Sequence, residues 1–374
     1  MARHTLYGWH MSYFTGKALC YLRYKKVDFD FRQVNYITLM KKIKAKTGAV
    51  VMPVIKTADG QWIQDTSVII DRFESETPVN PVMPDTPLQQ FASRLLEAWG
   101  DEWWIPSAMY TRWCHPENYV VFEHDAGKGL LPWAPWFIQK RVAAIPAKAM
   151  RSLLPWVGVI PEQYKALDDW NAQMMDALDA HFKQTPFLLG NRPSLGDFGL
   201  VGSMYGHHGR DPWPKRELLT PRKNLSAWLT RMTNPEQFSQ GALWPADEMP
   251  PTLDPVFHSI FREFVPFVRK TADAVSLKFA DFPVGKPLPR RVDMIEGNLA
   301  GKPFTRGGLV YMIWMVQRAL DTFNSFSAED QNTIRKWLKS WDAEDLVTKA
   351  WPRVERVALT VCLAERIESK KVAA

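Results

Sequence analysis

The sequence predicts an α/β domain at the N-terminus, followed by a longer part that is mainly helical. Two apolar runs rich in β-branched residues lie between residues 50 and 64 and flank Asp59-Gly60, and an Asp-Gly turn between such runs is typical of a β-hairpin. Four prolines between residues 78 and 87 mark a linker, because proline fixes φ and lacks the backbone donor. From residue 88 onward, apolar residues recur every three or four positions, which indicates helices.

The other elements of the first domain follow in order. Residues 5–9 are expected to form a short strand and residues 17–24 a helix, with a loop between them that delivers side chains to the helix N-terminus. Residues 28–34 alternate apolar and polar side chains with period two, which predicts a second strand. With the hairpin and a helix that begins near Val68, the predicted order is β-α-β-α-β-β-α over about eighty residues.

Pro53 and Asp65 indicate a binding site around the hairpin. Pro53 stands inside a strand-like run, where its missing N–H would cost a ladder bond, so we expect it at a strand start or edge, where a cis bond is tolerated. Asp65, Thr66 and Ser67 directly precede an apolar helical run and are typical N-cap residues. Because a helix N-terminus holds a carboxylate well, this arrangement predicts a compact site for a small zwitterionic or anionic peptide.

This stretch resembles the glutathione-binding half of the cytosolic glutathione transferase superfamily, whose pattern is Val-Pro, a hairpin with Asp-Gly, then Glu-Ser and an apolar helix. Here Met52-Pro53 and Asp65-Thr66 occupy those places. The resemblance implies a thioredoxin-like α/β N-terminal domain plus an all-α C-terminal domain. It also implies glutathione as cosubstrate and, as the state of assembly, a homodimer. The residues expected to bind glutathione are Met52, Pro53, Asp65, Thr66 and Ser67. The alternative is an ordinary α/β hairpin without a ligand.

The helical part carries further signals. Residues 88–113 are expected to form one long helix or a broken pair, with the break at Pro106, and residues 165–182 form another helix. Ser194 and Asp197 stand three residues apart before an apolar run, as in a capping box. The preceding Phe-Leu-Leu-Gly with this Ser-x-x-Asp resembles the same family, as does the later helix at residues 224–232.

The resemblance covers about residues 4–235, and the chain departs from the family beyond that point. Residues 243–303 are rich in proline around an amphipathic piece at 255–275, and residues 304–366 are expected to form two or three more helices. We therefore divide the chain into a thioredoxin-like domain (1–80), an all-α domain (88–235) and a C-terminal helical extension (236–374).

Glutathione chemistry needs a thiolate, and a free thiol has a pKa near 8.5, so a hydrogen-bond donor and a helix N-terminus are used to lower it. Ser12 is the expected donor, because it takes the place of the catalytic residue in the Ser-Pro-Phe or Cys-Pro-Phe motif of serine- and cysteine-type transferases. The motif here is Ser12-Tyr13-Phe14, without the proline. Tyr7, Tyr13 and Thr15 are rival hydroxyls. Serine in place of cysteine favours conjugation, thiolytic ether cleavage or isomerisation over a mixed-disulfide route.

Aromatic side chains in residues 99–115 suggest a pocket for the second substrate. A helix at this point of the family faces the thiol across the cleft. Trp104, Tyr110 and Trp113 are expected to line a pocket for a hydrophobic, flat aromatic electrophile, with Arg112 placed for an anionic or carbonyl group. The alternative is core packing, with Arg112 paired to Asp101 or Glu102.

Other patterns lead to no site. Gly297 to Lys302 is one residue short of a phosphate loop, and His207-His208 beside Asp211 lacks a third metal ligand, so no metal is expected. The lysine-rich residues 41–46 lack a recognition motif and are expected to be a solvated helix face, not a nucleic-acid site. Residues 130–141 combine tryptophan with cations, as interfacial segments do, so a flap over the cleft and a membrane-surface contact are both hypotheses. For the whole chain we expect no membrane contact.

Composition sets the class of protein. With 46% hydrophobic and 23% charged residues, the chain is an ordinary globular protein. Its three cysteines form no C-x-x-C pair, and no apolar leader follows Met1, so we expect a cytoplasmic protein. Residues 1–80 hold five of the seven excess positive charges, which favours an anionic ligand such as glutathione. The sequence therefore predicts a glutathione-dependent transferase; the alternative is a non-catalytic relative that serves as a binding or scaffold module, and DNA binding ranks third.

Overall fold

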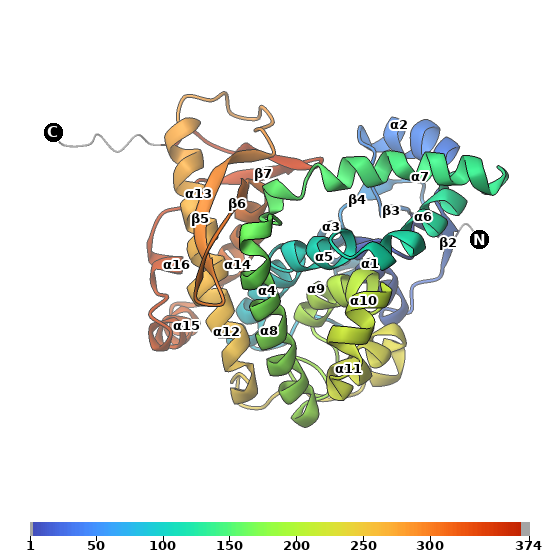
Figure 1. Cartoon of the computed structure of the whole chain (residues 1–374). Coiled ribbons are helices and arrows are strands. Elements are labelled where there is room, and N and C mark those ends of the chain that lie inside the picture. Colours follow the sequence, from blue (N-terminus) through green and yellow to red (C-terminus); the bar gives the residue numbers. More distant parts are fainter. Residues whose placement is uncertain (1–2, 368–374) are drawn as a thin grey trace.

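The computed structural model describes residues 3–367, and its N-terminal part is a four-stranded sheet with helices on it (Figure 1). The strand order is β2-β1-β3-β4, with β1 parallel to β2 and antiparallel to β3, and β3 antiparallel to β4. The predicted order of elements is confirmed. Their bounds are β1 His4–Gly8, α1 Tyr13–Tyr24, β2 Phe29–Gln33, η1 Thr38–Ile43, α2 Lys44–Thr47, β3 Val54–Lys56, β4 Trp62–Gln64 and α3 Thr66–Glu76.

Local signals position the ends of these elements. Helix α1 begins four residues earlier than predicted, because the Ser12 hydroxyl accepts the Thr15 N–H and caps it. In the hairpin turn Gly60 has φ of 91°, which suits glycine, and its N–H donates to the Thr57 carbonyl at 2.9 Å. The Met52–Pro53 bond is cis, just before β3 begins.

The middle of the chain is helical, as predicted. The 88–113 stretch is a broken pair: α4 ends at Glu102, and Pro106 lies in the first turn of α5, where its missing N–H costs no helical bond. The bounds are α4 Pro87–Glu102, α5 Ile105–Trp113, α6 Pro116–Leu130, α7 Trp136–Arg151, η2 Pro155–Val157, η3 Pro161–Gln163, α8 Tyr164–Gln184, α9 Leu195–Ser203, η4 Met204–His208, α10 Pro212–Pro214, η5 Lys215–Leu219, α11 Lys223–Thr233 and η6 Pro235–Phe238.

The capping box at α9 is confirmed. Asp197 Oδ2 accepts the Ser194 N–H at 2.9 Å, and Asp197 Oδ1 accepts the Leu188 N–H and the Trp228 indole N–H, each at 2.9 Å. One fully buried carboxylate thereby fixes the start of α9, the preceding loop and α11 relative to one another.

The C-terminal extension contains the predicted helices and also two β-hairpins that the sequence did not predict. The β5–β6 turn is formed by Ala300 and Gly301, with φ of 52° and 75°, and lacks the Asn-Gly or Asp-Gly pair that marks such turns. The bounds are η7 Pro251–Leu253, α12 Asp254–Ser259, η8 Ile260–Phe264, α13 Val265–Lys278, β5 Arg291–Leu299, β6 Lys302–Leu309, α14 Tyr311–Asn324, α15 Ala328–Ser340, α16 Asp345–Thr348, β7 Val354–Val357 and β8 Thr360–Leu363.

The extension shares its core with the helical domain. The buried Glu263 carboxylate accepts the indole N–H of Trp103 at 3.3 Å and of Trp170 at 2.9 Å, and the Ala300 N–H at 2.8 Å. Helix α14 packs along α4. Because side chains from all three predicted units join one continuous apolar core, the unit boundaries at 80, 88 and 235 stay predictions.

Candidate active site

Two adjoining cavities lie between the sheet domain and the helices. The small cavity, of about 250 Å³, is bounded by the N-terminus of α3, the end of α4 and the extension. The large cavity, of about 660 Å³, is bounded by the N-terminus of α1, by α5 and by α7. Four residues line both cavities, namely Phe14, Val51, Met52 and Ile105. A ligand in one cavity therefore meets a ligand in the other at these side chains.

The α3 end of the small cavity offers free donors. Asp65 caps the helix, since its Oδ1 accepts the N–H groups of Ser67 at 2.9 Å and Val68 at 3.2 Å. Asp65 has φ of 87°, a strained value for a residue with a side chain, which the surrounding contacts hold in place. In the described part of the chain, neither the N–H nor the hydroxyl of Thr66 has a hydrogen-bond partner. Thr66 can therefore donate twice to an anionic group at the positive end of α3.

Met52 adds a second set of free backbone groups. It lies outside β3, and within residues 3–367 its N–H and C=O have no hydrogen-bond partner. Since Met52 lines both cavities, its backbone is available to pair with an extended peptide segment that runs from one cavity into the other.

The opposite wall of the small cavity is acidic. Asp101 and Glu102 from the end of α4 line it. Burial, and then the neighbouring Asp101, raise the pKa of Glu102 to about 8, and burial likewise raises the pKa of Asp101. Tyr311 of α14 donates its hydroxyl to Asp65 Oδ2, so the extension also forms a wall. The exposed Arg290 lines the cavity beside it.

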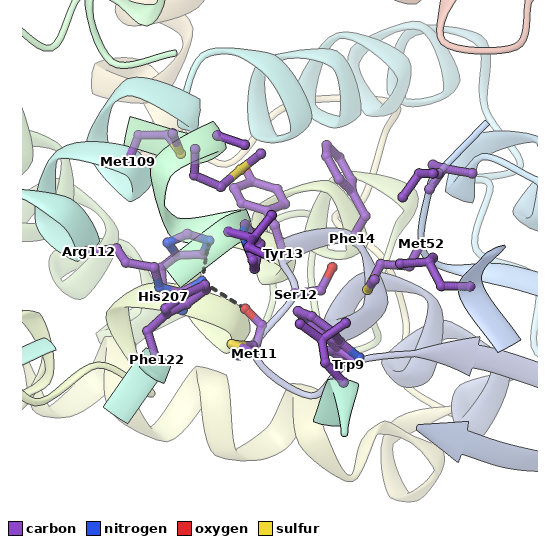
Figure 2. A pocket seen from close by; sticks show the side chains of 18 of the residues that line it. Trp9, Met11, Ser12, Tyr13, Phe14, Met52, Met109, Arg112, Phe122 and His207 are labelled. Carbon is purple, nitrogen blue, oxygen red and sulfur yellow. Dashed lines mark hydrogen bonds between the residues drawn. The ribbon is translucent and has the colours of Figure 1, made fainter. Parts of the chain in front are cut away.

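Ser12 lies at the wall of the large cavity, with Phe14 and Met52 on one side and Tyr13 on the other (Figure 2). As the N-cap of α1, it places both its hydroxyl and the free N–H groups of the first turn beside the junction of the cavities. The rest of the lining is almost wholly apolar.

The three rival hydroxyls are placed differently. The Tyr13 hydroxyl donates to the Gly100 carbonyl in the core. Tyr7 stacks on Trp62 at 5.3 Å between ring centroids, and Thr15 is fully buried beneath the first turn. Neither Tyr7 nor Thr15 lines a cavity described above. Of the four, the Ser12 hydroxyl is the one that combines the large cavity with the free end of α1.

Helix α5 presents one face to the large cavity, and this face differs from the predicted one. Arg112 and Trp113 line the cavity, but Trp104 and Tyr110 do not. Trp104 is fully buried and packs edge-on against Trp170, while Tyr110 packs against Tyr164. The lining positions on α5 follow the 3.6-residue period and are Ile105, Ala108, Met109, Arg112 and Trp113. Ile105, Ala108 and Met109 thus take the lining positions that were expected of Trp104 and Tyr110.

The Arg112 guanidinium is already paired. It bridges both carboxylate oxygens of Asp211, at 2.8 and 3.0 Å, and donates to the carbonyl of Met11 at 3.0 Å and to that of Gly206. The partner is Asp211 and not Asp101 or Glu102. Arg112 therefore holds the α1 loop against η4, and no free charge from it reaches the large cavity.

His207 and His208 also take part in packing. His207 Nδ1 contacts the Ala108 carbonyl at 2.9 Å, and His208 Nε2 contacts the Ser107 hydroxyl at 2.9 Å. Burial lowers the pKa of both histidines, that of His208 to about 4. Residues 3–367 contain no group of three or more His, Cys, Asp or Glu side chains arranged to hold a metal.

Comparison with known protein families identifies two domains of the chain. Residues 6–81 match the family model of the glutathione S-transferase N-terminal domain, and residues 172–231 match that of the C-terminal domain. The chain therefore contains both domains of a glutathione S-transferase. Its N-terminal domain is the thioredoxin-like domain predicted from the sequence, followed by the all-α domain and the additional C-terminal elements. A search of curated proteins finds no significant match.

Solved structures of the family are similar over part of the chain. A GST-like protein from Pseudomonas syringae is 22% identical, covering 62% of this chain and 67% of that one, with a TM-score of 0.38. A glutathione S-transferase from Methylobacillus flagellatus KT, solved with GSH bound, is 15% identical over 63% and 96%, with a TM-score of 0.38. Beta-etherase LigF from Sphingobium sp. strain SYK-6 is 18% identical over 64% and 100%, with a TM-score of 0.41.

Sequence reasoning missed the contribution of the extension to the small cavity. Arg290, Tyr311 and Met315 line it, although they are more than two hundred residues away from Asp65 in the sequence. No local motif marks these positions. The sequence suggests Glu102 only as a partner for Arg112, yet it stands at the end of α4 and lines the cavity. The break at Pro106 is the signal that could place it there.

Proposed function

We propose that this protein is a glutathione-dependent enzyme that brings the glutathione thiolate to an uncharged hydrophobic substrate. The observation that carries the proposal is the junction of the two cavities at Phe14 and Met52, beside the capped start of α1. A polar peptide in the small cavity can extend its thiol to this junction, where a substrate in the large cavity would meet it.

The small cavity suits the polar ends of glutathione. One carboxylate would accept the N–H and hydroxyl of Thr66 at the positive end of α3. The α-ammonium would lie near the carboxyl groups of Asp65 and Asp101, which line the cavity from the ends of α3 and α4, and the cysteinyl backbone would pair with Met52. The Ser67 N–H donates to Asp65, and the Ser67 hydroxyl donates to Glu97 at 2.7 Å. Ser67 therefore fixes the helix end and has no free donor of its own.

Ser12 would stabilise the thiolate. A free thiol has a pKa near 8.5, and a hydroxyl donor together with the free N–H groups at the start of α1 lowers it toward neutral pH. In conjugation and in thiolytic ether cleavage alike, the sulfur then forms a bond to an electrophilic carbon and the leaving group departs with its electron pair. Isomerisation would instead add the sulfur to a conjugated carbon–carbon double bond without loss of any group, with the electron pair moving onto the conjugated carbonyl, and would then expel the thiolate after rotation about the new single bond. Because Arg112 is neutralised by Asp211, the large cavity favours a substrate without charge.

Titration calorimetry with glutathione, ultraviolet absorbance of the thiolate, and turnover of a panel of hydrophobic electrophiles test the proposal together. We expect Ser12→Ala to retain glutathione binding, to raise the thiol pKa by about one unit or more, and to lower turnover. Tyr13→Phe tests the rival hydroxyl and Ser152→Ala is the matched exposed control; both should leave the thiol pKa unchanged. If glutathione binds without turnover of any electrophile and Ser12→Ala leaves the thiol pKa unaltered, the protein is a non-catalytic binding module instead.

Compartment and assembly belong to the same proposal. Cys20, Cys114 and Cys362 are all free thiols, which fits the reducing cytoplasm in which glutathione is abundant. Within residues 3–367, no helix is both long enough and apolar enough to cross a lipid bilayer. The homodimer implied by the family stays a prediction, and analytical ultracentrifugation of the full chain measures it.

A further inference from the structure

Two stretches of the sequence, residues 32–50 and 128–160, frame the mouth of the large cavity and are called here the mouth segments. Each contains five Lys or Arg and no Asp or Glu. The cations are Arg32, Lys41, Lys42, Lys44 and Lys46 in the first, and Lys128, Lys140, Arg141, Lys148 and Arg151 in the second. These ten charges exceed the net charge of +7, so the rest of the chain carries a net charge of −3. The positive excess of the protein is therefore concentrated in the mouth segments.

The same segments also carry most of the exposed apolar side chains. Fifteen large apolar side chains in the described part of the chain are exposed, and ten of them lie in the mouth segments. They are Tyr36, Ile37, Val50, Trp133, Trp136, Phe137, Ile145, Met150, Leu153 and Trp156. Trp136 is 73% exposed and Ile145 69%. Exposed apolar groups concentrated in this way indicate a contact surface, whereas those of an ordinary monomer are scattered.

The two segments face each other across the cavity. Tyr36 and Val50 from the first segment, and Ile145 and Met150 from the second, line the large cavity while each remains exposed by more than a third. These four side chains therefore stand at its opening. In Figure 1, α2 of the first segment and α7 of the second lie toward the same end of the molecule. Apolar side chains from both segments thus meet at one opening, and the ten cations lie on the same two segments.

Most of the cations have no acidic partner. Lys140 pairs with Glu123 at 3.4 Å, and the Arg151 guanidinium lies over the ring of Tyr119 at 4.4 Å. The other eight make no ion pair with any residue between 3 and 367. All ten are exposed. An anionic partner would meet a surface whose charges are not yet neutralised.

We propose that the mouth segments bind the surface of an anionic lipid bilayer, so that the large cavity opens toward the membrane. Lys and Arg attract anionic headgroups, while tryptophan and aliphatic side chains enter the boundary between headgroups and acyl chains. A second copy of the chain would bring ten like charges against ten, and nucleic acid would leave the aliphatic groups at the opening without a partner. This reverses the sequence-based expectation of no membrane contact. Delivery of a lipophilic substrate from the bilayer into the cavity follows if the proposed function holds.

Co-sedimentation of the full chain with vesicles tests the charge component. We expect binding to vesicles that contain about 30% phosphatidylglycerol, much weaker binding to pure phosphatidylcholine, and a decline with salt. The double variant Arg141→Glu with Lys148→Glu should bind at least about tenfold more weakly, since each cation near the surface contributes about a factor of five. The matched control, Lys336→Glu with Lys339→Glu, makes the same charge change on exposed positions of α15 and should bind as the unaltered protein does.

A second pair of variants tests the apolar component. Trp136→Ser with Phe137→Ser should reduce the binding that persists at high salt, whereas Leu277→Ser, at a position 84% exposed on α13, should not. Thermal melting shows whether each variant folds. Calorimetry with glutathione tests the proposed function separately, so that a loss of vesicle binding can be told apart from a loss of glutathione binding. Equal binding to neutral and anionic vesicles, undiminished binding by the charge-reversal variant, or binding to duplex DNA in place of vesicles would each overturn the proposal. Self-association that Trp136→Ser with Phe137→Ser abolishes would also overturn it, because the mouth segments would then be an interface between copies of the chain.

Discussion

The small and the large cavity share Phe14, Val51, Met52 and Ile105, yet their other walls differ in chemistry and in origin. The small cavity is walled by helix-end donors and carboxyl groups from α3, α4 and the extension. The large cavity is walled by apolar side chains from α1, α5 and α7, with methionine prominent among them. The small cavity can recognise a ligand by fixed hydrogen bonds, whereas the large cavity can recognise a ligand only by its volume and polarity.

The support behind the two cavities differs in the same way. Behind the small cavity, Lys17 is fully buried and its ammonium contacts Glu97 at 2.8 Å and Asp101 at 2.6 Å. Arg318 of the extension reaches Glu97 at 3.2 Å and Asp71 at 2.5 Å. The large cavity has a mouth of exposed side chains on α7 and on residues 36–50. We infer that polar recognition needs this network to hold its groups in place, whereas the apolar cavity can adapt to several substrates.

Breaking the support of the small cavity should have the largest effect. Lys17→Met leaves the Glu97 and Asp101 carboxyls facing each other without their shared cation in the core. Since removing one partner of a buried ion pair leaves an uncompensated charge, we expect a loss of about 3–5 kcal/mol in the free energy of unfolding, measured by urea denaturation. Lys165→Met removes an exposed cation that contacts Asp169 at 3.1 Å, and should cost less than about 1 kcal/mol. Equal losses in the two variants would contradict this account of the network.

The pH dependence of stability should sharpen the contrast, because Glu102 belongs to the small cavity alone. Its pKa is raised to about 8 in the folded protein, above that of an unfolded glutamate near 4.3, so the folded state holds a proton that the unfolded state releases. Stability should therefore fall as pH rises from about 4.5 to 8, by about 2–4 kcal/mol from this group. Glu102→Gln should remove that part of the decline.

The acid side of the same profile provides the control. Burial lowers the folded-state pKa of His181 and of His208 to about 4, so both stay neutral in the folded protein while they take up protons in the unfolded one. Their contribution to stability is complete above about pH 6.5 and is lost as pH falls toward 4. Because this window overlaps that of Glu102 between about pH 4.5 and 6.5, Glu102→Gln should keep the histidine contribution and steepen the rise there, and it should flatten the profile above about pH 6.5. An unchanged alkaline limb in that variant would show that Glu102 is already ionised in the native state.

The sequence predicted those features of the site that depend on neighbours in the chain. The Asp65 cap and the proline before β3 each arise from residues within a few positions, and the family pattern placed them in one domain with Ser12. The cap that Ser12 makes was not predicted, because the helix was expected to begin at Lys17. The sequence could not predict Tyr311, because the contact with Asp65 joins positions 246 residues apart and depends on packing of the whole extension. On α5 the size of the tryptophans suggested that they line the large cavity, but the position of each residue around the helix axis decides which side chains do so. Tyr110 lies two positions before Arg112 and therefore on another face.

Removing a single hydroxyl should weaken ligand binding in the small cavity and leave binding in the large cavity unchanged. Thr66→Val keeps the shape of the side chain and removes one of two free donors at the end of α3. Because a hydrogen bond to a charged group contributes about 1.5–3 kcal/mol, glutathione affinity should fall about tenfold or more in calorimetry. Affinity for an uncharged hydrophobic probe in the large cavity should not change. Thr230→Val, on the exposed face of α11, is the matched control, and an equal loss there would show a general effect of the substitution.

The converse change fills the large cavity. Met109 lines it from α5, and Met109→Trp adds volume to a space that has no hydrogen bonds to offer in compensation. Volume alone discriminates weakly, so we expect kcat/KM for a bulky hydrophobic electrophile to fall by about tenfold, while glutathione affinity stays within about twofold. Met294→Trp, at an exposed position of β5, should change neither quantity. If Met109→Trp weakens glutathione binding as strongly as it lowers turnover, the two cavities act as one site and do not bind the two ligands separately.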